Sequence, residues 1–271
     1  MRPTSRFDIL VILLLLAVPT AIARGDEATL TGRQIMDLVD ARDDGDNSTQ
    51  DMTMILIDKN GNQRERTIHA MSRDVGEDTH TIMFFLSPAD VKDTGFLTYD
   101  YDDESADDDQ WLYLPALKKT KRIASSDKSG SFMGSDFSYA DMTDRKLDNY
   151  EYRLMEETDV DGVPVWQVES IPITEKEIDE TGYTKSIVFV RKDNYVVIRA
   201  VSWVKKGNRL KYLDVKKLEK IDGIWVPTEM HMTTKKGKKT LHKTVITSDN
   251  VRFNQELDED LFTVRTLEKG L

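Results

Sequence analysis

The stretch QWLYLPALKKTKRI, residues 110–123, decides the fold together with GSFMGSDFSYADM, residues 130–142. The first piece is an aromatic and aliphatic strand that runs into a basic strand. The second is a Gly/Ser-rich loop with four large apolar side chains, Phe132, Met133, Phe137 and Tyr139. Loops normally run polar over a protein surface. These side chains therefore either fold back onto the core or form a lid over an apolar cavity.

Around this stretch, the chain reads as a succession of β-strands. Turn signals such as Asn60-Gly61 and Gly207-Asn208 separate apolar-rich segments of strand length. Successive strands on short turns predict an antiparallel meander, and a sheet of more than about ten strands is expected to curl strongly. The expected strands are 52–57, 64–71, 81–86, 95–101, 110–114, 118–123, 150–156, 165–170, 185–191, 196–205, 209–220, 225–234 and 240–251.

Few helices interrupt these strands. Thr31 and Gln34 fit a capping box, in which the threonine accepts from the backbone and the glutamine reaches back. An apolar stripe follows and predicts a helix over 31–42. A second helix is expected at about 138–148, after a serine cap, and a turn is expected near 257–262.

One of the expected strands carries apolar residues on both faces. Ile82, Phe84 and Leu86 point one way, whereas Met83 and Phe85 point the other way. This pattern predicts either a central strand that is covered on both sides or a strand with one face lining an internal hollow.

The two pieces of the central stretch resemble the signature of the outer-membrane lipoprotein-sorting proteins of the LolA-like superfamily. Residues 88, 90–92 and 95–97 upstream and 225–227 and 261–262 downstream match as well. The resemblance implies a mainly β, α+β fold. It would be a strongly curved antiparallel half-barrel of about eleven strands, with a few helices in its concave side and a cavity for lipid.

The resemblance also implies a function. It is that of a periplasmic carrier or chaperone, which binds a lipid or the acyl chains of a lipoprotein and ferries it between membranes. An RND-type inner-membrane transporter as partner, transient membrane contact and a monomeric state are expected. The absence of cysteine removes the lipidated residue of the LolB-like members, so the likeness is to the soluble LolA-like carriers. These carriers use a cavity-facing arginine in their gate, and the candidates here are Arg64, Arg66 and Arg73.

The alternative from another class is an RseB-like periplasmic sensor, which shares the half-barrel but binds a signalling protein. Such a chain would carry a second C-terminal domain, whereas we expect one domain over 24–271. No motif supports an enzyme: the nucleophile-elbow and phosphate-loop spacings fail around 130–134, and each histidine stands alone. The acidic stretch 40–51 lacks the ligands of a calcium loop. We expect no catalytic residue, no metal and no cofactor.

Charge and the N-terminus indicate where the chain works. A formal net charge of -11 argues against nucleic acid as a partner and against anionic lipid surfaces as the main driving force of binding. Residues 1–23 have a basic start, an apolar run over 9–18 and a small-x-small site, which is typical of a signal peptide cleaved near Ala23. The apolar run is shorter than the roughly 20 residues of a retained anchor. We expect an exported, periplasmic protein.

The expected site is an apolar cavity whose walls carry flexible side chains. The chain has eleven methionines, whose flexible side chains suit variable acyl chains, although any one of them also serves as ordinary core filling. Burying an acyl chain gains roughly 0.8 kcal/mol per methylene, so a carrier needs an apolar hollow and a mobile lid. The residues expected in the cavity or its lid are Met52, Met54, Phe84, Leu86, Trp111, Tyr113, Phe132, Met133, Phe137, Tyr139 and Met142.

Overall fold

The protein is described by a computed structural model over residues 30–271. The signal peptide expected over 1–23 lies outside these residues. Between residues 30 and 271, thirteen strands join in one antiparallel sheet, in the order β6-β5-β4-β3-β2-β1-β13-β12-β11-β10-β9-β8-β7. The strands are β1 (Asn47–Asp58), β2 (Gln63–Val75), β3 (Asp78–Ser87), β4 (Gly95–Asp100), β5 (Asp109–Leu114), β6 (Lys119–Arg122), β7 (Tyr150–Val160), β8 (Val163–Pro172), β9 (Tyr183–Arg191), β10 (Val197–Val204), β11 (Arg209–Ile221), β12 (Ile224–Lys236) and β13 (Lys239–Phe253).

The mainly β fold class is confirmed, and every expected strand segment forms a strand of this sheet. The family resemblance implied about eleven strands, two fewer than residues 30–271 contain. β1 is longer than expected because its first residues, 47–51, are polar and show no apolar pattern, yet they pair with β2. β1 also pairs with β13, with Met54 opposite Ile246, so the two halves of the meander form one continuous sheet.

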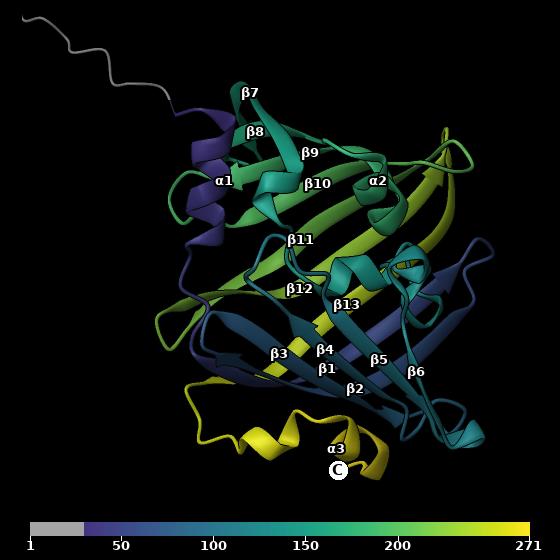
Figure 1. Cartoon of the computed structure of the whole chain (residues 1–271). Coiled ribbons are helices and arrows are strands. Elements are labelled where there is room, and N and C mark those ends of the chain that lie inside the picture. The colour runs from purple at the N-terminus through teal and green to yellow at the C-terminus, as the bar shows by residue number, and fades with distance from the viewer. Residues whose placement is uncertain (1–29) are drawn as a thin grey trace, which may run out of the picture.

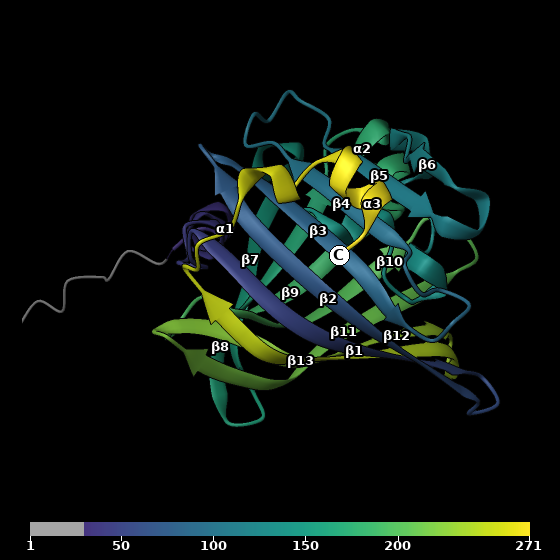
Figure 2. The ribbon, with the colours of Figure 1, turned by 90° about the horizontal axis from the view of Figure 1, so that it is seen from below.

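The sheet is strongly curved, as the twist of so many strands requires. Figure 1 shows it curled around the segment 123–149 that connects β6 to β7. We call the face toward this segment the inner face. Helix α3 (Val264–Lys269) lies on the opposite, outer face, where it contacts β4, β5 and β6 (Figure 2).

Both faces of β3 are buried. Phe85 points inward and joins the apolar cluster beneath the 123–149 segment. Ile82 and Phe84 point outward and pack against Phe262 and Leu267, which the C-terminal segment lays over the sheet. The pattern on this strand therefore reflects a central strand that is covered on both sides, with its inner face turned toward the hollow of the sheet.

Helix α1 (Gly32–Asp40) confirms the helix expected over 31–42. The Thr31 hydroxyl accepts from the amide of Gln34 at 3.2 Å, and the Gln34 side-chain oxygen accepts from the amide of Thr31 at 2.9 Å. The apolar stripe of α1, with Ile35 fully buried, packs on the inner face near Val188.

The helix expected over 138–148 is wrong. Two 3₁₀ turns, Tyr139–Met142 and Leu147–Asn149, stand in its place. The expected serine cap does form a capping box, but it supports only one turn. The helix does not continue because the amide of Asp144 donates to the carboxylate of Asp100 on β4, at 2.6 Å, instead of to a helical carbonyl.

Helix α2 (Glu175–Thr181) was not predicted, because its residues are mostly charged or polar and form no apolar stripe. Local signals for it are present: Thr174 caps the helix by accepting from the Glu177 amide, and Gly182 ends it with a positive φ. The turn expected near 257–262 is present as the 3₁₀ turn Glu259–Leu261. Further 3₁₀ turns are Pro115–Leu117, Ser125–Asp127 and Phe132–Gly134. Among the helices of residues 30–271, none has the length and apolar character needed to cross a membrane.

Candidate functional site

A largely apolar cavity of about 520 Å³ lies between the inner face of the sheet and the 123–149 segment. Six methionines line it, contributed by β1, β3, β12 and the segment itself. Unbranched thioether side chains can adopt many shapes, so this wall can adapt to what it contacts. The apolar lining consists of Met52, Met54, Ile68, Met83, Phe132, Phe137, Ala140, Met142, Leu213, Met230, Met232 and Ile246.

Two phenylalanines of the Gly/Ser-rich loop reach into this hollow. Phe132 is 1% exposed and Phe137 is 7% exposed. The Phe132 ring lies 5.0 Å from the ring of Phe96 and 5.7 Å, edge to face, from the ring of Tyr139. These are favourable aromatic spacings. The loop therefore lies folded on the core, with its apolar side chains forming one wall of the cavity.

The loop closes on itself as a small hairpin. The amide of Phe132 donates to the carbonyl of Phe137 at 2.8 Å, and the amide of Tyr139 donates to the carbonyl of Gly130 at 3.0 Å. Met133 at the tip has a positive φ of 50°, a backbone conformation that residues other than glycine seldom adopt. This internal bonding leaves few backbone groups that hold the loop to the sheet, so its attachment depends on side chains.

Asp136 provides one attachment. Its carboxylate accepts from the hydroxyls of Thr234 at 2.5 Å and Thr244 at 2.8 Å, and lies 2.6 Å from Nδ1 of His242. Its amide donates to the Thr244 hydroxyl at 2.9 Å. A buried carboxylate requires such partners, and here they all come from β12 and β13. The loop is thereby fastened to the centre of the sheet.

Arg66 provides a second attachment. It is 7% exposed, and Nη1 donates to the carbonyl of Met133 at the loop tip. The guanidinium lies 5.9 Å from the centre of the Phe85 ring, and burial lowers the pKa of Arg66 from its ordinary value. Of the three candidate gate arginines, Arg66 is the one that contacts the loop: Arg64 is exposed, and Arg73 pairs with Glu259 at 3.0 Å.

Four carboxyl groups also line the cavity, those of Asp44, Asp100, Asp141 and Asp144. Asp100 on β4 accepts from the Asp144 amide, and burial together with the charge of Asp108 raises the pKa of Asp100 to about 8. This shift favours the protonated form of Asp100 in the folded protein. The cavity wall therefore carries less negative charge than the sequence implies.

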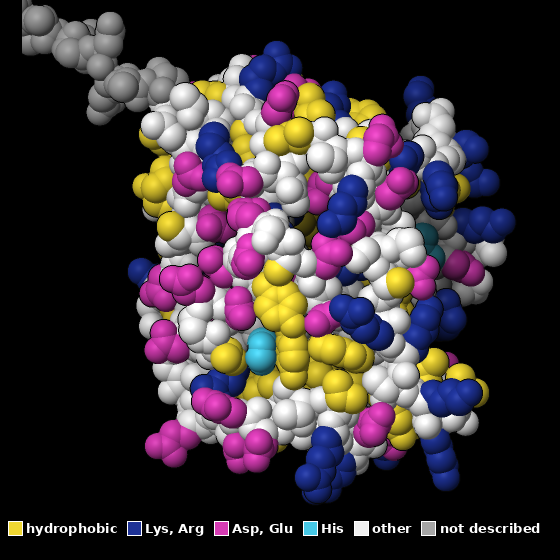
Figure 3. Space-filling view, in the orientation of Figure 1, with side chains coloured by type: hydrophobic (Ala, Val, Ile, Leu, Met, Phe, Trp, Pro, Cys, Tyr) yellow, Lys and Arg dark blue, Asp and Glu magenta, His cyan; other side chains and the backbone are white. Residues whose placement is uncertain are grey.

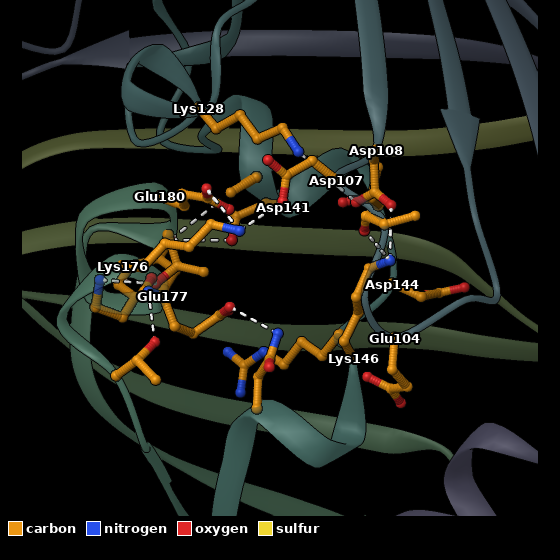
Figure 4. Close-up of a pocket in the computed structure, with 18 of the residues that line it drawn as sticks. Glu104, Asp107, Asp108, Lys128, Asp141, Asp144, Lys146, Lys176, Glu177 and Glu180 are labelled. Carbon is orange, nitrogen blue, oxygen red and sulfur yellow. Dashed lines mark hydrogen bonds and ion pairs between the residues drawn. The ribbon is translucent and has the colours of Figure 1, made fainter.

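A second, polar cavity of about 250 Å³ adjoins the apolar one and shares Ala140, Asp141 and residues 143–145 with it (Figure 4). Lys146 points into this network, where its ammonium donates to the carbonyls of Tyr101, Asp103 and Ala106 at 3.1, 2.8 and 2.6 Å. Lys176 of α2 bonds Asp107 at 2.7 Å. These contacts tie the acidic 101–108 connection and α2 to the 123–149 segment, so they hold the cavity wall in place.

The structure brings together part of the expected site. Met52, Met54, Phe132, Phe137 and Met142 line the cavity. Met133 and Tyr139 pack against the same inner cluster.

The other expected residues lie elsewhere. Phe84, Trp111 and Tyr113 belong to the outer cluster beneath the C-terminal segment, and Leu86 is 43% exposed. The alternation along β3 and β5 explains this placement, because the neighbours Phe85 and Leu112 occupy the inner face.

Sequence reasoning missed other contributors. Met83, Leu213, Met230 and Met232 line the cavity, but their facing depends on strand pairing across the whole sheet. Asp136 lies within the central motif, and its burial gave no sequence signal. Within residues 30–271, no group of three or more histidine, aspartate or glutamate side chains is arranged to hold a metal ion.

Comparisons with known proteins place the chain among relatives of the same architecture. A family model described as "Uncharacterized protein" matches residues 77–269. A DUF1329 family protein from Desulfovibrio piger is 32% identical, with a TM-score of 0.79, and the match covers 87% of this chain and 97% of that chain. A domain assigned as an outer membrane lipoprotein-sorting protein from Vibrio parahaemolyticus is also 32% identical, with a TM-score of 0.79 and coverage of 88% and 98%.

A third solved structure shares the fold at lower identity. A LolA superfamily protein from Nitrosomonas europaea has a TM-score of 0.65 at 16% identity, over 88% of this chain and 100% of that chain. No curated protein matches the sequence.

Proposed function

The chain belongs to the family of the DUF1329 protein and the lipoprotein-sorting domain described above, and from this premise we propose that it is a periplasmic carrier for acyl chains. The predicted resemblance to lipoprotein-sorting proteins is confirmed by these relatives, and the LolA superfamily protein shares the fold. The observation that carries the proposal is the methionine-lined cavity of about 520 Å³ beneath a loop that side chains such as Asp136 and Arg66 hold to the sheet. The cargo would be a lipid or the acyl chains of a lipoprotein.

The physical basis is the transfer of methylene groups out of water. Each buried methylene contributes about 0.8 kcal/mol, so ten of them contribute roughly 8 kcal/mol. This gain opposes the cost of opening the loop, which includes its hydrogen bonds and the buried contacts of Phe132 and Phe137. Adaptable methionine walls would let one cavity accept chains of different shape.

The loop would act as a competing occupant of the hollow. Phe132 and Phe137 fill the volume next to the cavity in the closed state. A longer acyl chain would displace them, which requires release of Met133 from Arg66 and of Asp136 from its partners on β12 and β13. In this proposal Arg66 and Asp136 set the ease of opening.

The function would consist of binding and release without catalysis. The cavity wall is largely apolar, and such a surface holds a hydrocarbon chain without reacting with it. We further propose cleavage near Ala23, one domain over 24–271, and unloading through an RND-type inner-membrane transporter. The relatives assigned to lipoprotein sorting support a carrier role in general.

Cavity occupancy can be tested with the mature protein and a fluorescent fatty acid. Leu213 on β11 lines the cavity, so Leu213→Trp should fill it and lower probe affinity by at least about tenfold. Leu210 lies three residues earlier on the opposite face, where it pairs with Lys235, and Leu210→Trp is the matched control with unchanged affinity. Absence of probe binding to the wild-type protein, or equal loss in both variants, would contradict the proposal.

A further inference from the structure

Charge is strongly segregated in this molecule. Three turns at one end of the sheet, within residues 58–66, 205–211 and 235–243, hold twelve Lys or Arg residues and two carboxylates. The whole chain nevertheless has a net charge of -11. At the other end, the 100–109 segment holds seven Asp or Glu and no Lys or Arg. We call the three turns together the basic end.

These turns are neighbours in space. They connect β1 to β2, β10 to β11, and β12 to β13, and β1, β13, β12 and β11 are consecutive in the sheet. The register places Asp58 opposite His242 and Leu210 opposite Lys235. Figure 3 shows Lys and Arg side chains crowding the right-hand edge, to which the tips of these hairpins point in Figure 1.

Most of these cations are available for an external partner. Within residues 30–271, Lys205 and Lys211 make ion pairs, and Arg66 bonds the loop. The other nine make no ion pair: Lys59, Arg64, Lys206, Arg209, Lys235, Lys236, Lys238, Lys239 and Lys243. Such a concentration of unpaired charge destabilises a fold by self-repulsion, so it points to a partner of opposite sign.

We propose that the basic end docks the protein on an anionic lipid bilayer, through headgroup phosphates. This inference rests on the proposed carrier function and adds the surface by which the carrier meets a membrane. Seven of the nine cations are lysines. Five of them are exposed at the turns, Lys59, Lys206, Lys236, Lys238 and Lys239, and the other two are half-buried in the adjoining strands. Lysine acts as a flexible point charge that suits a diffuse array of phosphates. An acidic protein would favour bidentate arginine contacts in a shaped groove.

The opposite end makes the docking directional. An anionic surface attracts the basic end and repels the acidic 100–109 segment, so a protein of net negative charge still binds, in one orientation. Leu117, which is 63% exposed in the turn between β5 and β6 at the same end of the sheet, adds an apolar side chain toward the bilayer. Net charge alone therefore does not describe how this chain meets lipid.

Docking would also act next to the attachments of the loop. Thr234 and His242, which hold Asp136, stand at the base of the β12–β13 hairpin, and Arg66 stands at the base of the β1–β2 hairpin. The loop over the cavity is thus fastened to the elements that would face the headgroups. Cargo exchange would take place at the membrane surface.

The test uses vesicles of phosphatidylcholine with about one third phosphatidylglycerol, and vesicles of phosphatidylcholine alone. Wild-type protein should float with the first and not with the second, and binding should fall between about 0.1 M and about 0.5 M salt. The triple variant Lys236→Gln, Lys238→Gln and Lys239→Gln should bind the anionic vesicles about 100-fold more weakly than wild type. Each lysine is expected to contribute a factor of about five to the affinity. The matched control neutralises Lys216, Lys217 and Lys220, exposed on β11 away from the basic end, and should bind as wild type.

The outcomes distinguish a failure of membrane docking from a failure of acyl-chain binding in the cavity. In buffer without vesicles, the fluorescent fatty acid should bind both triple variants as tightly as the wild type. Failure of wild type to bind anionic vesicles, or equal loss in variant and control, overturns the docking inference while the probe still reports on the carrier proposal. Binding to soluble polyglutamate in preference to vesicles would assign the basic end to an acidic protein and overturn it as well.

Discussion

Oδ2 of Asp136 lies 2.6 Å from Nδ1 of His242, although 106 positions separate the two residues in the sequence. The contact joins the tip region of the loop to the strand that follows the basic β12–β13 turn. It also explains why a Gly/Ser-rich loop stays folded over the inner face. The loss of chain entropy on ordering such a loop must be offset by contacts of this kind.

Replacement of Asp136 should therefore loosen the loop. Asp136→Ala leaves the hydroxyls of Thr234 and Thr244 and the imidazole of His242 without their shared acceptor, which should cost about 2–3 kcal/mol in the free energy of unfolding. Urea titration measures this loss. Asp127→Ala, at an exposed aspartate in the same segment, should change stability by less than about 0.5 kcal/mol. Equal effects of the two substitutions would show that the attachment contributes nothing.

A second prediction separates a gate from ordinary core packing. Phe132→Ala enlarges the inner cavity, so affinity for a fluorescent fatty acid should change clearly, whereas stability should fall by less than about 3 kcal/mol. Phe84→Ala is the matched truncation in the outer cluster, and it should destabilise without a change in probe affinity. Thermal melts and probe titrations measure both quantities. A large destabilisation with unchanged affinity for Phe132→Ala would make the loop purely structural.

A third prediction follows from Asp100. Burial raises its pKa to about 8, so the folded state holds a proton that the unfolded chain releases near its ordinary pKa of 3.8. Its contribution to stability is therefore greatest at low pH and falls as pH rises from about 4 to about 8. Asp100→Asn removes this pH-dependent contribution. The free energy of unfolding of the variant should therefore rise relative to that of wild type as pH increases through that window. Urea titrations at about pH 5 and about pH 8 measure the difference.

The control for this pH effect is the exposed Asp102 in the same connection. Asp102→Asn, a substitution at the surface, should change the free energy of unfolding by less than about 0.5 kcal/mol. A pH dependence that is identical in wild type and Asp100→Asn would mean that Asp100 titrates in the folded state much as it does in the unfolded chain.

The strands and the first helix could be predicted because their signals are local. Apolar segments between turn residues mark each strand, and the capping box at Thr31 marks α1. The helix expected over 138–148 failed because its amides bond distant groups such as Asp100, which no local pattern records. Tertiary contacts decided this segment.

The site was predicted only in part for a similar reason. Alternation along a strand divides residues into two faces, but the curvature of the complete sheet decides which face becomes inner. Phe84 and Trp111 therefore went to the outer cluster, although Met52 and Met54 line the cavity. The segregation of charge could not be predicted from the net charge of the chain. That number adds together the basic turns and the acidic 100–109 segment, which lie at opposite ends of the sheet.

The last prediction concerns Arg66 as the fastening of the loop tip. Its guanidinium is buried, and burial lowers its pKa, so the charge carries a desolvation cost that the bond to the Met133 carbonyl offsets. Arg66→Met removes both the cost and the bond, so the free energy of unfolding should change by less than about 1 kcal/mol. The loop, however, should open more often. Hydrogen exchange at the amides of Ser135 and Tyr139, and the association rate of the fatty-acid probe, should both increase.

Arg64→Met is the matched control, because Arg64 lies on the same strand and its side chain is exposed. It should leave exchange and association rates as in wild type. A large loss of stability in Arg66→Met without faster exchange would mean that Arg66 supports the core of the sheet and does not set the opening of the loop. Faster exchange in the loop at an unchanged free energy of unfolding is the result expected if Arg66 only holds the loop closed. An arginine that supports the sheet would instead change the free energy of unfolding of the whole protein.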